Sequence, residues 1–137
     1  MKKSIEEGLQ KAISYTSYRK LISDLIASGK SSGPIQSEDL LNYSKLNDRR
    51  MTRLDKTIQL SHETLLALKK NDKPITWLVL TEGWCGDAAQ TLPVINKIAD
   101  EIAAANPNKH KAIKVKPCKL KIPKTRSLGI IKEIKIA

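Results

Sequence analysis

Residues 75–89, ITWLVLTEGWCGDAA, are the stretch that decides the fold. The first seven residues are nearly all apolar and rich in strand-favouring types, which predicts a central β-strand covered on both faces. A helical pattern begins at Gly86, so Cys85 lies between a strand and the N-terminus of a helix. Backbone N–H groups and the helix dipole at such a position stabilise a thiolate, the form of cysteine that attacks disulfides. The sequence therefore marks Cys85 as the candidate nucleophile.

The helix predicted after Cys85 spans residues 86–105, where apolar residues recur at three- and four-residue spacing. Pro93 lies inside this stretch. Because proline has no amide hydrogen, we expect one missing helical hydrogen bond and a kink at that point. Residues 106–108, Asn-Pro-Asn, are expected to end the helix.

The chain before the strand predicts a helical region over residues 1–72. One amphipathic helix is expected over 4–28, because its apolar residues follow the helical period. A second is expected to start at Ser37, a good N-cap followed by two acids, and to be interrupted near 47–48. A third is expected over 50–70. Charged residues of this region are expected to form a solvated helix face: Asp48, Arg49, Arg50 and Arg53.

Residues 109–137 form a basic Lys/Ile-rich tail. They hold 10 Lys and Arg and one acid, so they contribute +9 to the net charge of +11. Apolar and basic residues alternate over 113–116 and 120–122, which predicts short strands, with a disordered tail as the alternative. The tail has no aromatic residue and no recognisable RNA-binding motif. Any attraction to nucleic acid is therefore expected to be weak and unspecific.

Composition also excludes several classes of protein. No apolar run approaches the roughly 20 residues that a membrane span requires, and residues 1–7 lack the apolar segment of a secretory signal. We therefore expect a cytoplasmic protein with reduced thiols and no membrane partner. The cysteines, Cys85 and Cys118, and the histidines, His62 and His110, show no zinc-site spacing. Neither a metal nor an organic cofactor is expected.

Residues 74–105 resemble the active-site segment of the thioredoxin family. The resemblance rests on the strand, on Glu-Gly-Trp-Cys-Gly at 82–86, on a proline eight residues after the cysteine, and on the helix that follows. The helical region before it and the motif Trp-Cys-Gly-Asp-Ala are similar to a group of bacterial thioredoxin-like proteins. The implied architecture is α/β, a partial thioredoxin-like fold of a strand and a kinked active-site helix over 73–108. It is preceded by the helical extension 1–72 and followed by the tail 109–137.

The resemblance also implies roles for individual residues. Cys85 would be the attacking thiol. The residues that would shape the active site around it are Trp84, Gly86, Asp87, Ala88 and Pro93. Trp84 is implied to be a flat apolar cover beside the sulfur, and Pro93 to shape the active-site helix.

Three departures from the family pattern bear on the chemistry. Ala88 stands where the family has its resolving cysteine, so a mixed disulfide on Cys85 would need an outside thiol such as glutathione. Asp87 places a carboxylate near Cys85, which opposes thiolate formation although it suits the helix dipole. Val79 stands where many relatives have a buried acid, so proton transfer lacks its usual helper.

The resemblance ends after the helix. The family fold continues with further strands, a helix and a cis-proline loop, and Ile122-Pro123 is the only pair similar to that loop. Residues 108–122 are too few for the missing elements, because a parallel crossover alone takes a dozen residues or more. We therefore expect a C-terminal half that is truncated or altered. The Lys/Ile texture suggests an out-of-frame tail.

These observations favour thioredoxin-like thiol–disulfide exchange through the single cysteine Cys85, in support of cell redox homeostasis. The expected partners are protein disulfides or glutathione mixed disulfides. Two alternatives stay open. In the first, Cys85 is an inert buried cysteine and residues 1–70 form a non-catalytic helical interaction module. In the second, the basic tail binds polyanions unspecifically.

Overall fold

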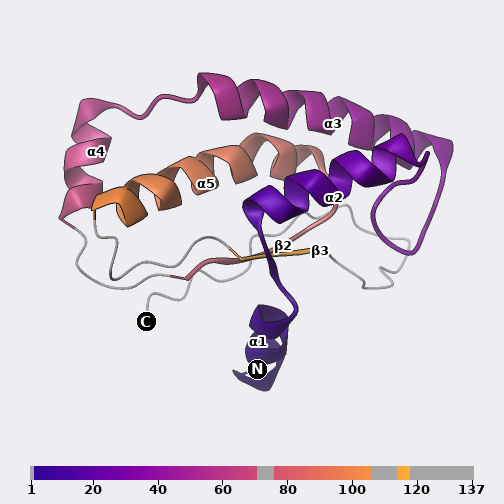
Figure 1. Cartoon of the computed structure of the whole chain (residues 1–137), viewed down its shortest axis with the longest axis horizontal. Coiled ribbons are helices and arrows are strands. Elements are labelled where there is room, and N and C mark those ends of the chain that lie inside the picture. Colours follow the sequence, from indigo (N-terminus) through magenta and orange to yellow (C-terminus); the bar gives the residue numbers. More distant parts are fainter. Residues whose placement is uncertain (1, 71–75, 106–113, 118–137) are drawn as a thin grey trace.

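The computed structural model describes residues 2–70, 76–105 and 114–117. Along the chain its elements are α1 (Lys2–Gln10), β1 (Ile13–Ser14), α2 (Tyr15–Ala27), α3 (Glu38–Thr57), α4 (His62–Lys69), β2 (Leu78–Thr81), α5 (Gly86–Ala105) and β3 (Lys114–Pro117). Figure 1 shows α2, α3 and α5 on one side of the strands and α1 on the other. The expected α/β class is therefore compatible with the structure.

The described strands form a three-stranded sheet in the order β1-β3-β2. β3 is parallel to β2, with Val115 opposite Val79, and antiparallel to β1, with Val115 opposite Ile13. β2, α5 and β3 thus form a β-α-β unit in which α5 belongs to the crossover. The strand predicted over 113–116 is confirmed as β3. The remaining expectations for the tail, including the strand at 120–122 and the loop at Pro123, lie outside the described residues.

The predicted central strand over 75–81, covered on both faces, corresponds to β2, but its predicted start is wrong. β2 begins only at Leu78, and within the described sheet it lies at an edge. Alternate residues of a strand point to opposite faces. Val79 packs against the hydrophobic core, whereas Leu80 is 48% exposed. On the face that carries Leu78 and Leu80, α1 packs closely against Leu78. The approach is so close that a Cβ atom added to Gly8 would lie 2.9 Å from the Leu78 Cδ2 atom.

The single helix expected over residues 4–28 is also wrong, because β1 separates α1 from α2. Ser14 ends the strand in an extended conformation and caps α2, where its Oγ atom accepts a hydrogen bond of 3.1 Å from the Ser17 amide. Ile13 pairs with Val115 far along the chain. The amphipathic pattern of the segment carries no information about such a distant partner, and tertiary pairing overrides it here.

α3 confirms its predicted start but not its predicted interruption. Ser37 is the N-cap, and its Oγ atom accepts from the Leu40 amide at 3.2 Å. The helix then runs without a break through residues 47–48. Asn47 is a poor helix former chiefly because its side chain competes for nearby backbone groups. Here the side-chain amide bonds outside the helix, so that competition is removed.

The third predicted helix, over residues 50–70, is divided in the structure. α3 ends at Thr57, and α4 begins after the cap residue Ser61. The Oγ atom of Ser61 accepts a hydrogen bond of 3.1 Å from the Thr64 amide. The apolar pattern over residues 50–70 therefore covers two helices, because Ser61 caps a second helix start within it.

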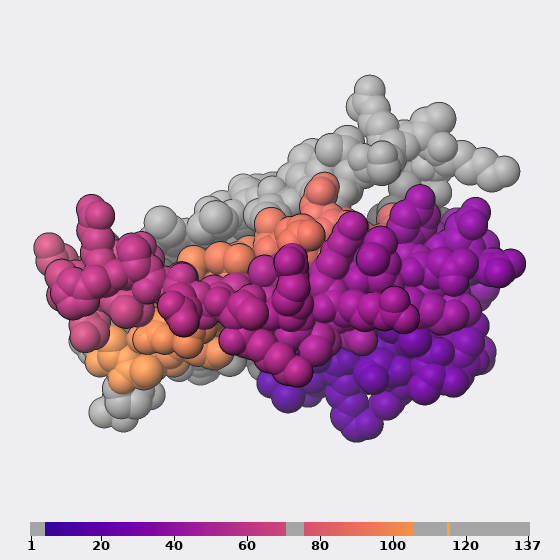
Figure 2. Space-filling view, turned by 90° about the horizontal axis from the view of Figure 1, so that it is seen from above, coloured from indigo at the N-terminus to yellow at the C-terminus, as the bar shows by residue number. Residues whose placement is uncertain are grey.

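α5 has the bounds predicted for it, with the buried Pro93 inside. Figure 2 shows α3 lying across α5, with α2 beside α3. Between the helices and the sheet lies one hydrophobic cluster, whose buried members are Tyr15, Tyr18, Ile22, Met51, Ala89, Leu92 and Val115. The helices α2 and α3 therefore share a core with the strand–helix unit. No helix in the described part of the chain is long and apolar enough to span a bilayer.

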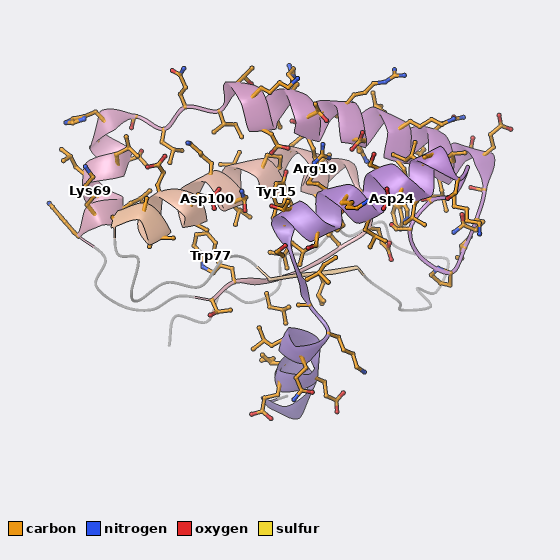
Figure 3. All side chains as sticks on the ribbon, in the orientation of Figure 1. Tyr15, Arg19, Asp24, Lys69, Trp77 and Asp100 are labelled. Carbon is orange, nitrogen blue, oxygen red and sulfur yellow. The ribbon has the colours of Figure 1, made fainter. Side chains whose placement is uncertain are left out.

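A polar network joins α2 to α3 at the surface of this core. Arg19 forms ion pairs with Asp48 at 2.9 Å and with Asp55 at 3.3 Å. The Tyr15 hydroxyl donates to Asp55 at 2.8 Å. The labelled Tyr15 and Arg19 side chains lie between the two helices in Figure 3. Asp48, expected on a solvated face, instead helps to fix α3 against α2.

Candidate active site

Cys85 lies in the turn that joins β2 to α5. Its amide donates to the Glu82 carbonyl at 3.1 Å, which closes the turn, and its carbonyl accepts from the Ala89 amide at 3.1 Å. The second bond is the first of α5, so Cys85 directly precedes the helix as predicted. The side chain is half-buried and its thiol is free. The turn therefore places Cys85 directly before the amide groups of the first helical turn, which have no intrahelical partner.

The residues that the resemblance singled out surround this turn. Trp84 and Gly86 are half-buried on either side of Cys85, and Asp87 is exposed in the first turn of α5. Ala88 packs against the hydrophobic core, and Pro93 is buried one to two turns further along. The positions where the family has a resolving cysteine and a buried acid are thus held by apolar residues that contact the core, namely Ala88 and Val79.

Glu82 is a buried acid that sequence reasoning treated only as a motif letter. It follows β2 directly and is 6% exposed. Ser32 donates to the Glu82 Oε2 atom at 2.5 Å and accepts from the Gly83 amide at 2.7 Å. Burial raises the pKa of the Glu82 carboxyl above its ordinary value of 4.5, and the hydrogen bond from Ser32 partly opposes this rise. A carboxyl with a raised pKa therefore lies three residues before Cys85.

Two glycines allow the segments around Glu82 to approach closely. Gly33 has a φ of +90°, and a Cβ there would lie 3.1 Å from the Glu82 Oε1 atom. A Cβ on Gly83 would lie 2.8 Å from the Cδ1 atom of Ile22. Side chains at these positions would displace the turn or its supports, so glycine is required for this packing.

α3 brings two side chains close to the turn, one near Gly83 before Cys85 and one near Gly86 after it. Asn47 is 1% exposed, and its Nδ2 atom donates to the Gly83 carbonyl at 3.1 Å. Its Oδ1 atom accepts from the Arg50 Nη1 atom at 3.2 Å. That Nη1 atom lies 3.8 Å from the point where a Cβ on Gly86 would be. The expected solvated face is thus wrong for Arg50, although Arg49 and Arg53 are exposed.

Tyr18 lies fully buried behind the turn, and its hydroxyl has no hydrogen-bond partner among the described residues. Burial raises the pKa of Tyr18. The Thr81 side chain lowers it in part, and the charges of Glu82 and Cys85 raise it further. The hydroxyl stays protonated at neutral pH.

Sequence reasoning found the segment around Cys85 but missed its supports. The sequence did contain a signal for the role of Glu82, because this acid stands directly between the predicted strand and the cysteine motif. Ser32, Asn47 and Arg50 had no comparable signal, because each reaches the turn from a distant part of the chain. Within the described ranges, no group of three or more His, Cys, Asp or Glu side chains is arranged to hold a metal ion.

Comparison with known proteins gives one family match. The family model described as Thioredoxin matches residues 33–110, more than half of the chain. The match begins before α3, well to the N-terminal side of the segment 74–105 on which the resemblance rested. Neither the curated proteins nor the solved structures give a match. The β-α-β unit and its covering helices are compatible with a partial thioredoxin-like fold.

Proposed function

We propose a function from the premise that this chain belongs to the thioredoxin family. A redox role of the thioredoxin kind follows in general terms from that membership. More specifically, we propose that Cys85 is the nucleophile of a single-cysteine thiol–disulfide exchange that serves cell redox homeostasis. The observation that carries this proposal is a free, half-buried thiol directly before a 20-residue helix.

The position of Cys85 favours the reactive form of the thiol. The first amide groups of a helix have no intrahelical partner, and the N-terminal end of the helix carries partial positive charge. Both effects favour a thiolate, which is the attacking species in disulfide exchange. Trp84, Gly86, Asp87, Ala88 and Pro93 would shape the site.

The proposed cycle has two exchange steps. In the first, the Cys85 thiolate attacks one sulfur of a substrate disulfide; a mixed disulfide forms, and the other sulfur leaves as a thiolate that takes a proton from water. In the second, the thiolate of an outside thiol such as glutathione attacks the substrate sulfur of the mixed disulfide and releases the Cys85 thiolate. Because Ala88 carries no sulfur, this second thiol cannot come from the motif itself.

The substrates proposed for this cycle are protein disulfides and glutathione mixed disulfides. A reducing compartment such as the cytoplasm would keep Cys85 reduced between cycles and would supply the second thiol. No metal or organic cofactor takes part in either step.

The test is the rate at which the reduced chain exchanges with a glutathione mixed disulfide of a test peptide, with glutathione as the resolving thiol. We expect Cys85→Ser to abolish the exchange, and Cys118→Ser, the matched control at the other cysteine, to retain it. Reaction of Cys85 no faster than that of free glutathione at the same pH would overturn the proposal. The apolar packing of Ala88 and Val79 would in that case favour a non-catalytic binding protein.

A further inference from the structure

Arg50 brings a positive charge to the turn that carries Cys85. Its Nη1 atom lies 3.8 Å from the point where a Cβ on Gly86 would be, and Gly86 directly follows the cysteine. Because Gly86 has no side chain, the guanidinium lies beside the backbone at the start of α5. The charge therefore comes from α3, an element far from Cys85 in the sequence.

The position of the guanidinium is fixed by a buried neighbour. Asn47 is 1% exposed, and its Nδ2 atom donates a hydrogen bond of 3.1 Å to the Gly83 carbonyl. Its Oδ1 atom accepts from Arg50 at 3.2 Å. An arginine has five N–H donors, so this single bond orients the group and leaves most of its donors for another partner. The side chain is half-buried, which limits the number of conformations it can adopt.

The charge of Arg50 is not neutralised by any carboxylate of the described residues. The contrast with Arg19 is direct, because Arg19 forms ion pairs with both Asp48 and Asp55. The ion pairs of the described chain involve Arg19, Lys20 and Lys97, and none involves Arg50. Arg50 is thus an oriented guanidinium without an ion-pair partner among the described residues, next to the residue that follows the free thiol. Such a group is available to bind an anionic group of a substrate.

We propose that Arg50 is a specificity-determining residue that binds a carboxylate of the disulfide substrate beside Cys85. This inference rests on the proposed function, and it deepens that function by naming the preferred substrate class, anionic disulfides. The planar fork of arginine pairs with both oxygens of a carboxylate. Arg50 takes no part in the bond changes. The carboxylate belongs either to glutathione or to an acidic residue of a peptide.

The test compares two small aromatic disulfides in a full-length Cys118→Ser background, so that only Cys85 reacts. One probe, 5,5′-dithiobis(2-nitrobenzoate), carries carboxylates, and the other, 2,2′-dithiodipyridine, is neutral. We expect Arg50→Gln to slow exchange with the anionic probe about tenfold, since hydrogen bonds to charged groups have that order of strength. Exchange with the neutral probe should stay within about twofold. The control Arg49→Gln removes the same charge from an exposed neighbour and should change neither rate by more than about twofold.

Equal slowing with both probes would show that Arg50 acts on the turn or on the Cys85 thiolate rather than on the charge of the substrate. That result would overturn the inference, as would no slowing with the anionic probe. Oxidised glutathione and a cystine-bridged peptide with flanking glutamates distinguish the two carboxylate sources. The probe that loses more rate in Arg50→Gln identifies the source.

A binding measurement separates this inference from the proposed function. S-methylglutathione has the two carboxylates of glutathione but no thiol, so it binds without reacting. Titrated into the Cys85→Ser chain, it should bind several-fold more weakly once Arg50→Gln is added. That result would support the contact even if wild-type Cys85 proved unreactive toward the neutral probe, which would overturn only the proposed function. Equal binding by the two chains would count against Arg50.

Discussion

The side-chain amide of Asn47 donates a hydrogen bond to the main-chain carbonyl of Gly83, two residues before Cys85. This bond joins the middle of α3 to the turn that presents the thiol. Ser32 holds the same turn from the loop between α2 and α3, through the Gly83 amide. The amide and the carbonyl of Gly83 are thus both held by side chains from the N-terminal helical region. The geometry around Cys85 therefore depends on this region.

Substitution Asn47→Ala should lower the free energy of unfolding by about 1–3 kcal/mol, because it leaves the buried Gly83 carbonyl without its donor. The exchange rate of Cys85 with a neutral disulfide should fall as well, since the turn loses a support. Urea unfolding and the exchange rate measure the two effects. Asn42→Ala, at an exposed position of the same helix, is the control. Equal stability of the two variants would show that the Asn47 bond has no net value.

Substitution Gly83→Ala should destabilise the chain by roughly 1–3 kcal/mol, because the new Cβ would overlap the Cδ1 atom of Ile22. Ile22→Val removes that atom. The double variant should therefore be more stable than the sum of the two single changes predicts. Thermal unfolding of the four chains gives the coupling directly. Additive effects would mean that the contact between Gly83 and Ile22 does not limit this position.

Glu82 predicts a specific pH dependence of stability. Its pKa is raised in the folded chain by burial, so the unfolded chain releases this proton at a lower pH. The contribution of Glu82 to stability is therefore fully present below the unfolded pKa and is lost as pH rises through the folded pKa. Glu82→Gln should flatten that loss when urea unfolding is followed between pH 4 and pH 8. The exposed Glu7→Gln should keep the wild-type profile. A Glu82→Gln profile parallel to wild type would contradict the prediction.

Two tyrosines of α2 should respond to the same change in opposite ways. Tyr18→Phe removes a buried hydroxyl that has no partner among the described residues, so stability should rise or stay equal. Tyr15→Phe removes a hydroxyl that donates to Asp55, and should cost about 1 kcal/mol. Thermal unfolding of both variants tests the contrast. A loss in Tyr18→Phe as large as that in Tyr15→Phe would show that the Tyr18 hydroxyl has a stabilising partner.

Local patterns predicted the parts of the fold that local forces decide. The bounds of α5 and the cap at Ser37 follow from residues within a turn or two of each other. The break at β1 does not, because Ile13 is extended through its pairing with Val115. The continuity of α3 through Asn47 depends on a carbonyl outside the helix, at Gly83. In each case a distant partner decides the outcome.

The same distinction between local patterns and distant partners applies to the candidate site. The position of Cys85 between a strand and a helix could be predicted, since both patterns are contiguous with it. The burial of Glu82 and the approach of Arg50 could not, because they result from packing of α3 and the preceding loop on the turn. Sequence patterns locate a reactive atom more readily than they locate the groups that surround it.

β3 lies between β1 and β2, although it is the last of the three strands along the chain. During synthesis the ribosome releases residues 13–14 and 78–81 well before residues 114–117. Within the described sheet, β1 and β2 therefore have no strand to pair with until β3 has emerged and the long loop before it has closed. We therefore expect a nascent chain with an incomplete sheet to be a chaperone client, and assembly of this sheet to be a late event in folding.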